Sequence, residues 1–125
     1  MPELGGGGSD AGASGDRAIV LEPPLSNTGV ININQGSGLP VRFAITNGNN
    51  TDVTAQLYIG VQGNLVPAIS NGNANDGNSF RPVGNNSFMF NLDTSHIPSG
   101  SHILMILLSD GAFREIDIYA SINNT

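Results

Sequence analysis

Apolar and polar residues alternate along most of the chain from Arg17 onward. Val41, Phe43 and Ile45 occupy every second position of one stretch, and the same period runs through 53–61. Successive side chains of a strand point to opposite faces, so a period of two indicates half-buried strands, and no stretch has a helical period. The pattern predicts nine strands, near 17–22, 29–33, 39–46, 53–62, 64–69, 79–83, 86–92, 101–109 and 112–121.

The last two predicted strands are the most clearly defined. Residues 103–108 are apolar at every position, which predicts a strand in the middle of a sheet with both faces covered. The strand that follows alternates, and we expect Ile116 and Ile118 to face the core. Between the two strands, Asp110-Gly111 is typical of a tight hairpin turn in which these residues supply positive φ angles.

Many short strands joined by asparagine- and glycine-rich turns predict an all-β fold. We expect an immunoglobulin-like antiparallel β-sandwich of about 7–9 short strands, with a small barrel as the alternative. A chain of 125 residues provides one core. Residues 17–122 are therefore predicted to form one domain. Residues 1–16, rich in Gly, Ser and Asp, are predicted to be a flexible tether, either native or an added linker.

Charge and cysteine usage exclude several classes of function. The net charge is −6 and none of the cationic residues is lysine, so the chain is expected to repel a phosphate backbone and not to bind nucleic acid. The absence of cysteine excludes disulfides and thiolate chemistry, and it leaves the compartment open. No stretch reaches the roughly 18 apolar residues of a membrane helix, so we expect no membrane insertion. Polarity comes instead from the 16 asparagines.

Two stretches of sequence contain an ordered set of motifs. In 21–43 a Pro-Pro pair and a polar loop lead to Pro40-Val41-Arg42-Phe43, and 88–111 contains an aromatic strand, Asp93-Thr94, a Gly turn and Asp-Gly. Together these motifs resemble the PxKF domain family. The resemblance covers about 21–118, although Arg42 stands where lysine is usual and His102 where tyrosine is usual. It implies a β-sandwich module of secreted or cell-surface bacterial and archaeal proteins, attached beside a separate catalytic or adhesive domain. It implies no established activity.

The motif residues each have a structural interpretation. Phe43 is expected in the core, and Arg42 is expected to point outward and to pair with Asp52, Glu115 or Asp117. The second motif is typical of a corner between two strands, and we expect His102 to anchor it. The motif positions predicted to be structural are Pro40, Arg42, Phe43, Asp93, Thr94, Gly100, His102, Asp110 and Gly111.

Catalytic and metal-binding patterns are weak. No nucleophile elbow, zinc motif or phosphate loop occurs, so we predict no enzyme activity and no cofactor. Glu115 and Asp117 share a strand face at roughly 7 Å, which suits paired carboxylates but is more simply a solvated face. His96 and His102 lack a third metal ligand.

The asparagine-rich loop 71–78 has the oxygen-rich spacing of calcium loops. It contains only one carboxylate, so any calcium affinity is expected to be millimolar or absent, and a plain turn is the simpler interpretation. The weak candidate ligands are Asn71, Asn73, Asn75 and Asp76. Amides beside an exposed aromatic residue, Tyr58 or Phe80, are an alternative site for sugars.

The sequence therefore predicts a non-catalytic accessory or spacer module of an extracellular or cell-surface protein. Its partners would be neighbouring domains of a longer chain, and the isolated domain is expected to be monomeric. The alternative is a binding module in which the loops 47–52, 71–78 and 84–87, expected at one end of the sandwich, bind a glycan or a protein.

Overall fold

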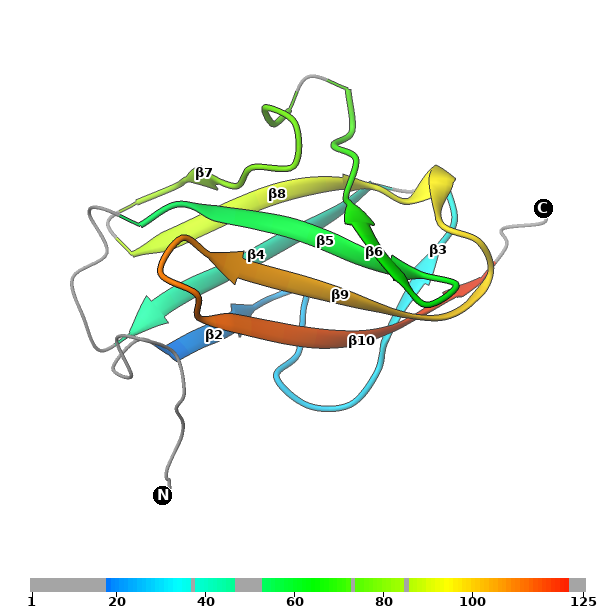
Figure 1. The fold of residues 1–125 in the computed structure, drawn as a ribbon. Coiled ribbons are helices and arrows are strands. Elements are labelled where there is room, and N and C mark those ends of the chain that lie inside the picture. Colours follow the sequence, from blue (N-terminus) through cyan, green and yellow to red (C-terminus); the bar gives the residue numbers. More distant parts are fainter. Residues whose placement is uncertain (1–17, 37, 47–52, 73, 85, 122–125) are drawn as a thin grey trace.

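The computed structural model describes residues 18–36, 38–46, 53–72, 74–84 and 86–121. Two β-sheets pack face to face in this part of the chain (Figure 1). The predicted all-β sandwich is therefore confirmed. The predicted tether, residues 1–16, and the predicted loop 47–52 lie outside the described residues.

All nine predicted strands have a counterpart, although the one predicted at 79–83 is only two residues long. The five-stranded sheet has the order β3 (Ile31–Asn34), β10 (Phe113–Ser121), β9 (Gly100–Leu108), β5 (Ala55–Val61) and β6 (Asn64–Pro67). The four-stranded sheet has the order β2 (Ala18–Glu22), β4 (Gly38–Thr46), β8 (Ser87–Asp93) and β7 (Arg81–Pro82). One turn of 3-10 helix, η1 (Thr94–His96), follows β8.

One strand pair departs from the predicted antiparallel order. β3 runs parallel to β10, with Ile31 opposite Ile118. The chain reaches β3 by crossing from β2 at the edge of one sheet to the edge of the other. No hairpin joins β3 to β10, so nothing imposes the antiparallel arrangement that a tight turn would require.

The core lies between the two sheets and is centred on an aromatic cluster. Phe43 of β4 is fully buried, and its ring stacks on Phe88 of β8 at 5.1 Å and meets the edge of Phe80 at 4.9 Å. Phe80 also contacts Phe90 at 5.7 Å. Leu104 and Ile106 of β9 supply the opposite face of the core. Aromatic pairs of this kind add about 0.5–1.5 kcal/mol each beyond the burial of their area.

The segment between β6 and β8 lies along one side of the sandwich and bonds alternately to β5 of one sheet and β8 of the other. Ala68 donates its N–H to Leu57 of β5, and Asn71 donates to Asn91 of β8. The chain then returns to β5 with the N–H of Phe80 bonded to Ala55, before β7 pairs with β8. The edges of β5 and β8 on this side are thereby hydrogen-bonded.

Asparagine side chains complete the hydrogen bonding of two strands. The Asn75 amide accepts from the Asn91 N–H at 2.9 Å and donates to the carbonyl of Met89 at 3.1 Å, as a neighbouring strand would. On the edge strand β2, the Asn27 amide accepts from the N–H of Leu21 and donates to its carbonyl, at 2.9 and 3.0 Å. Asn27 thereby satisfies backbone groups on the open side of β2, and Asn75 satisfies the N–H of Asn91, which lies beyond the last residue of β8 that β7 pairs with.

The β9–β10 turn differs from the predicted one in its backbone angles. Gly111 has a φ of 97°, but Gln62 is the only described non-glycine residue with a positive φ, so Asp110 does not supply one. The N–H of Leu108 bonds to Ala112, and the Asp110 carboxylate accepts from the N–H of Ala112 at 3.0 Å. The loop therefore has three residues, and in such loops only the last adopts the left-handed conformation.

The central strand β9 is buried on one face only. It lies between β10 and β5 as predicted, and Leu104, Ile106 and Leu108 face the core. Ile103, on the other face, is 39% exposed. The expectation that both faces are covered is wrong for the described structure, because no described element lies over the outer face of this sheet.

Truncating the central ring should destabilise the whole sandwich. Phe43→Ala is expected to lower the free energy of unfolding by about 3–5 kcal/mol, because it leaves a cavity between Phe80 and Phe88. Urea unfolding followed by circular dichroism measures the change. Phe113→Ala is the control, since that ring is 58% exposed. Equal losses in the two variants would contradict the assigned core.

Candidate functional site

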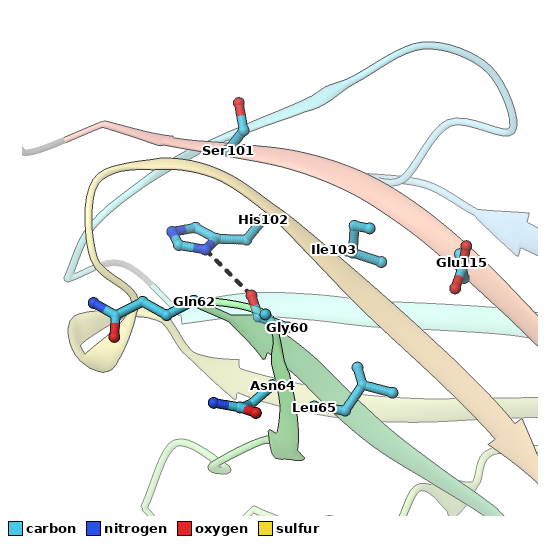
Figure 2. A pocket seen from close by; sticks show the side chains of 9 residues that line it. Gly60, Gln62, Asn64, Leu65, Ser101, His102, Ile103 and Glu115 are labelled. Atoms are coloured by element: carbon cyan, nitrogen blue, oxygen red, sulfur yellow. Dashed lines mark hydrogen bonds between the residues drawn. The ribbon is translucent and has the colours of Figure 1, made fainter.

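An open hollow of about 570 Å³ lies on the outer face of the five-stranded sheet, where β5, β6 and β9 meet (Figure 2). Ile103 and Leu65 form its apolar sides, and Glu115 of β10 lies at one end. Figure 2 shows Gln62 and Asn64 at the end away from Glu115. The lining residues are Gly60, Gln62, Gly63, Asn64, Leu65, Ser101, His102, Ile103 and Glu115.

The hollow exists because Gly60 has no side chain. Gly60 lies directly between Ile103 of β9 and Leu65 of β6 in the strand register. A Cβ atom at Gly60 would lie 3.7 Å from the Ile103 carbonyl oxygen and 3.9 Å from a Leu65 methyl group, which are ordinary contacts. A Cβ atom is therefore tolerated here, and a larger side chain would occupy the part of the hollow between Ile103 and Leu65.

His102 forms part of the wall and holds a corner of the fold. Its Nδ1 lies 3.3 Å from the carbonyl oxygen of Gly60, and its Nε2 lies 2.6 Å from that of Pro98. A neutral imidazole has one N–H, so only the protonated ring can donate to both oxygens. The ring thus links the turn after η1 to β5, and its nitrogens face the protein rather than a ligand.

The other corner residues are also engaged in the fold. Thr94 is buried; its hydroxyl donates to the Asn34 carbonyl at 3.2 Å and accepts from the Gly36 N–H at 3.0 Å. Gly100 has a φ of 116°, which a residue with a side chain rarely adopts. Thr94 therefore fastens the end of β3 and the residue Gly36 to η1, and Gly100 allows the turn into β9.

Asp93 caps the short helix η1. One of its carboxylate oxygens accepts from the Ser95 hydroxyl at 2.7 Å and from the Ser95 N–H at 2.9 Å. The hydroxyl bond and then the backbone bond lower the pKa of Asp93 from its ordinary value of 3.8; partial burial opposes them, and His96, 3.5 Å away, adds to the lowering. These bonds fix the corner by stabilising the charged carboxylate.

The outer face of β10 carries two carboxylates between two aromatic side chains. Phe113, Glu115, Asp117 and Tyr119 alternate with the inward-facing residues of the strand, and all four are exposed. Asp117 borders a second open hollow of about 450 Å³, which is also lined by Val30, Ser101, His102, Ile103 and Ile118. Each hollow therefore has one carboxylate from β10.

Arg42 is not near either of those carboxylates. It lies on the outer face of the four-stranded sheet, beside Glu22 of β2, whereas Glu115 and Asp117 lie on the outer face of the other sheet. The expected pairing with Glu115 or Asp117 is wrong because the core separates the two faces. Asp52, the third expected partner, lies outside the described residues. Arg42 Nε and Glu22 Oε1 are buried with no hydrogen-bond partner in the described structure.

The remaining motif residues are at strand ends and turns. Pro40, near the start of β4, lies opposite Asn91 of β8. Asp110 and Gly111 form the β9–β10 turn.

The described calcium candidates differ in how far the fold engages them. The oxygen of Asn75 accepts from Asn91, Asp76 is exposed, and Asn73 lies outside the described residues. The N–H of Asn71 bonds to β8. No group of three or more His, Cys, Asp or Glu side chains in the described ranges could hold a metal ion. Calcium binding by this loop stays a prediction.

The loops proposed for recognition are not all at one end of the sandwich. Asn75 lies beside Met89 and Asn91, along the side of β8, while Asn86 bonds to Ile45 at the end of β4. Phe80, considered as an exposed platform for sugars, is buried in the aromatic cluster. Tyr58 is half-buried on the outer face of β5.

Sequence reasoning did not find the hollow at Gly60. Two signals in the sequence point to it: a glycine inside an otherwise alternating strand, and a following strand, 103–108, that is apolar on both faces. Neither signal specifies that Leu65 and Ile103 flank the glycine, because that contact depends on strand order.

No family model matches the chain, and no curated protein matches it.

In the part of the chain that the structure describes, no helix has the length and apolar character to cross a membrane.

Asn75 should matter for stability. Asn75→Ala is expected to lower the free energy of unfolding by about 1–3 kcal/mol, because it leaves the N–H of Asn91 without its partner and removes one bond to the Met89 carbonyl. Thermal and urea unfolding measure the loss. Asp76→Ala, in the same loop but exposed, should change stability by less than about 0.5 kcal/mol. If both variants unfolded like the parent, the structural role of the Asn75 amide would be wrong.

Asp93 should contribute to acid sensitivity. A carboxylate whose pKa is lowered on folding stabilises the protein above its unfolded pKa, near 3.8, and this contribution is lost as the pH falls through the lower folded pKa. Urea midpoints measured between about pH 6 and pH 2.5 should fall less steeply below pH 4 for Asp93→Asn than for the parent chain. Ser95→Ala should have an intermediate slope, and three identical profiles would contradict the assignment.

Proposed function

We propose that this protein is a non-catalytic accessory module that acts as a rigid spacer in an extracellular or cell-surface protein. The proposal includes the immunoglobulin-like form of the sandwich, inferred from the pattern of short strands and turns, and its kinship with PxKF domains, inferred from the sequence motifs. Neighbouring domains of a longer chain would be its partners, and the isolated domain would be a monomer.

The observation that carries the proposal is the position of the two ends of the described sandwich. Arg114, near the start of β10, donates to the Ile19 carbonyl of β2 at 2.8 Å. The chain leaves β10 only at Ser121, roughly 23 Å further along the strand at about 3.3 Å per residue. Figure 1 shows the start of β2 and the end of β10 at opposite ends. A domain connected in this way separates the segments that flank it by its own length.

The chemistry of the motif residues supports a structural role. Phe43 is in the core, Thr94 and His102 bond to backbone groups, and Asp93 caps η1. These groups are occupied by the fold, so they are not poised for proton transfer or nucleophilic attack on a substrate.

Loop-mediated binding of a glycan or protein is the second candidate. It is favoured by the exposed position of Asp76 and Gly77 in the loop beside β8. Because the loop 71–78 and the turn before β8 lie apart, a ligand on both would have to extend along the side of the sandwich.

Distance measurements between the two ends test the spacer directly. The chain has no cysteine, so Ala18→Cys with Ser121→Cys gives two specific labels. Spin labels at these two positions should report a single separation near 20–30 Å. This range is the length along the strand with an allowance for the length of the label side chains. The separation should not change with millimolar Ca²⁺ or soluble cell-wall polysaccharides. Ala18→Cys with Thr46→Cys is the short-distance control, since these residues are paired neighbours.

Amide NMR shifts recorded in the same titrations separate the two candidates. A spacer shows no shifts. Amide shifts confined to 71–78 and 84–87 would contradict the spacer function and favour the recognition module. A broad distribution of distances between the two spin labels would contradict the rigidity of the domain.

A further inference from the structure

The outer face of the five-stranded sheet is more apolar than a solvated strand face requires. Ile103 is 39% exposed and Leu65 is 53% exposed, and the two flank Gly60 in one row across the sheet. In the next row Met105 lies between Tyr58 and Glu115. Contiguous apolar surface on one face of a monomeric protein often marks an interaction site.

Each of these apolar rows ends at a carboxylate of β10. Ile103 pairs with Asp117, and Met105 pairs with Glu115. No described lysine or arginine balances them on this face. Arg42 and Arg81 belong to the other sheet, and Arg114 turns its guanidinium to the carbonyl oxygens of Ile19 and Asn27 at 2.8 and 3.1 Å.

The spacing of the two carboxylates matches an extended chain. Glu115 and Asp117 are two residues apart on one strand face, which places them roughly 7 Å apart. Side chains at positions i and i+2 of an extended peptide have the same spacing and point to the same side. A peptide aligned with β10 would therefore bring every second side chain to a carboxylate.

We propose that this face binds an extended, basic protein segment in which lysine or arginine recurs at every second residue. The alkyl stems lie over Ile103, Leu65 and Met105, and the charged ends reach Glu115 and Asp117. The exposed rings of Phe113 and Tyr119, at the two ends of the acidic pair, are placed for cation–π contact with further basic residues. This binding role goes beyond the spacer function, and neither depends on the other.

The site favours a basic peptide over a neutral sugar. The sides of the Gly60 hollow are aliphatic, and the exposed rings of Phe113 and Tyr119 lie on β10 outside the hollow, so a sugar inside it has no such ring to stack on. The two amide side chains of the hollow, Gln62 and Asn64, lie at the end away from Glu115 (Figure 2). The nitrogens of His102 are directed to carbonyl oxygens of the fold. Carboxylates beside alkyl groups suit a lysine or arginine side chain, which is apolar along its length and charged at its end.

The test uses the full chain and an acetylated, amidated heptapeptide of alternating lysine and threonine. Titration followed by amide NMR should shift resonances of Ile103, Met105, Glu115 and Asp117, with an affinity that falls as salt rises. A peptide of the same composition with its lysines in one block should bind at least about threefold more weakly, because its charges do not match the i, i+2 spacing. The glutamate–threonine counterpart should not bind.

Matched variants separate a specific site from general charge attraction. Glu115→Gln and Asp117→Asn should each weaken binding about two- to fivefold, as expected for a partly exposed ion pair. Asp76→Asn removes the same charge from an exposed position elsewhere and should leave the affinity unchanged. Gly60→Val should weaken binding at least about fivefold while the protein keeps its thermal midpoint, because the new side chain narrows the hollow between Ile103 and Leu65 and its Cβ atom makes only ordinary contacts.

Three results would overturn the proposal. One is the absence of shifts at millimolar peptide, and another is an equal effect of Asp76→Asn and Glu115→Gln. The third is a different occupant of the face: a neutral cell-wall oligosaccharide that shifts the same amides, or shifts that depend on protein concentration alone and so indicate a second copy. In each case the end-to-end distance would be unaffected, so the spacer function would still be judged separately.

Discussion

The structure depends on the aromatic cluster around Phe43, in the core between the two sheets. The ring of Phe43 stacks on Phe88 within its own sheet and meets the edge of Phe80, which comes from the segment that passes between the sheets. The cluster therefore fixes the inner face of β4 and β8 and the path of the crossing chain together. Burial of this apolar surface is the main favourable term in folding, and it determines which face of every strand turns inward.

Backbone hydrogen bonds are completed by side chains where strands are missing. Asn75 and Asn27 act as substitutes for strand neighbours, and Thr94 and His102 fasten the loops at one corner. In a chain with little charge, these amides and hydroxyls satisfy polar groups at the sheet edges. Asn75 was a candidate calcium ligand in the sequence, because a side-chain amide that bonds to the backbone cannot be distinguished from one that binds a ligand until the fold is known.

The periodicity of the sequence was sufficient to predict where the strands lie along the chain, but not the order in which they pair. Alternation placed Phe43, Ile116 and Ile118 in the core, because side-chain direction follows strand position directly. It could not reveal that β3 joins β10 in parallel, or that Arg42 and Glu115 lie on opposite outer faces, since both depend on which strands become neighbours. The hollow at Gly60 was missed for the same reason. The excess of apolar residues in 103–108 was visible, but it was interpreted as burial rather than as an uncovered face.

Hydrogen exchange of the native protein, resolved by residue, tests most directly whether the aromatic contact holds the sandwich together. If it does, the amides of Val41, Phe43 and Phe90 should exchange only through global unfolding, together with those of Leu104 and Ile106, while residues of β6 and β7 exchange earlier. Protection of β9 and β10 with early exchange throughout β4 and β8 would contradict the account, because the five-stranded sheet would then be stable without the cluster.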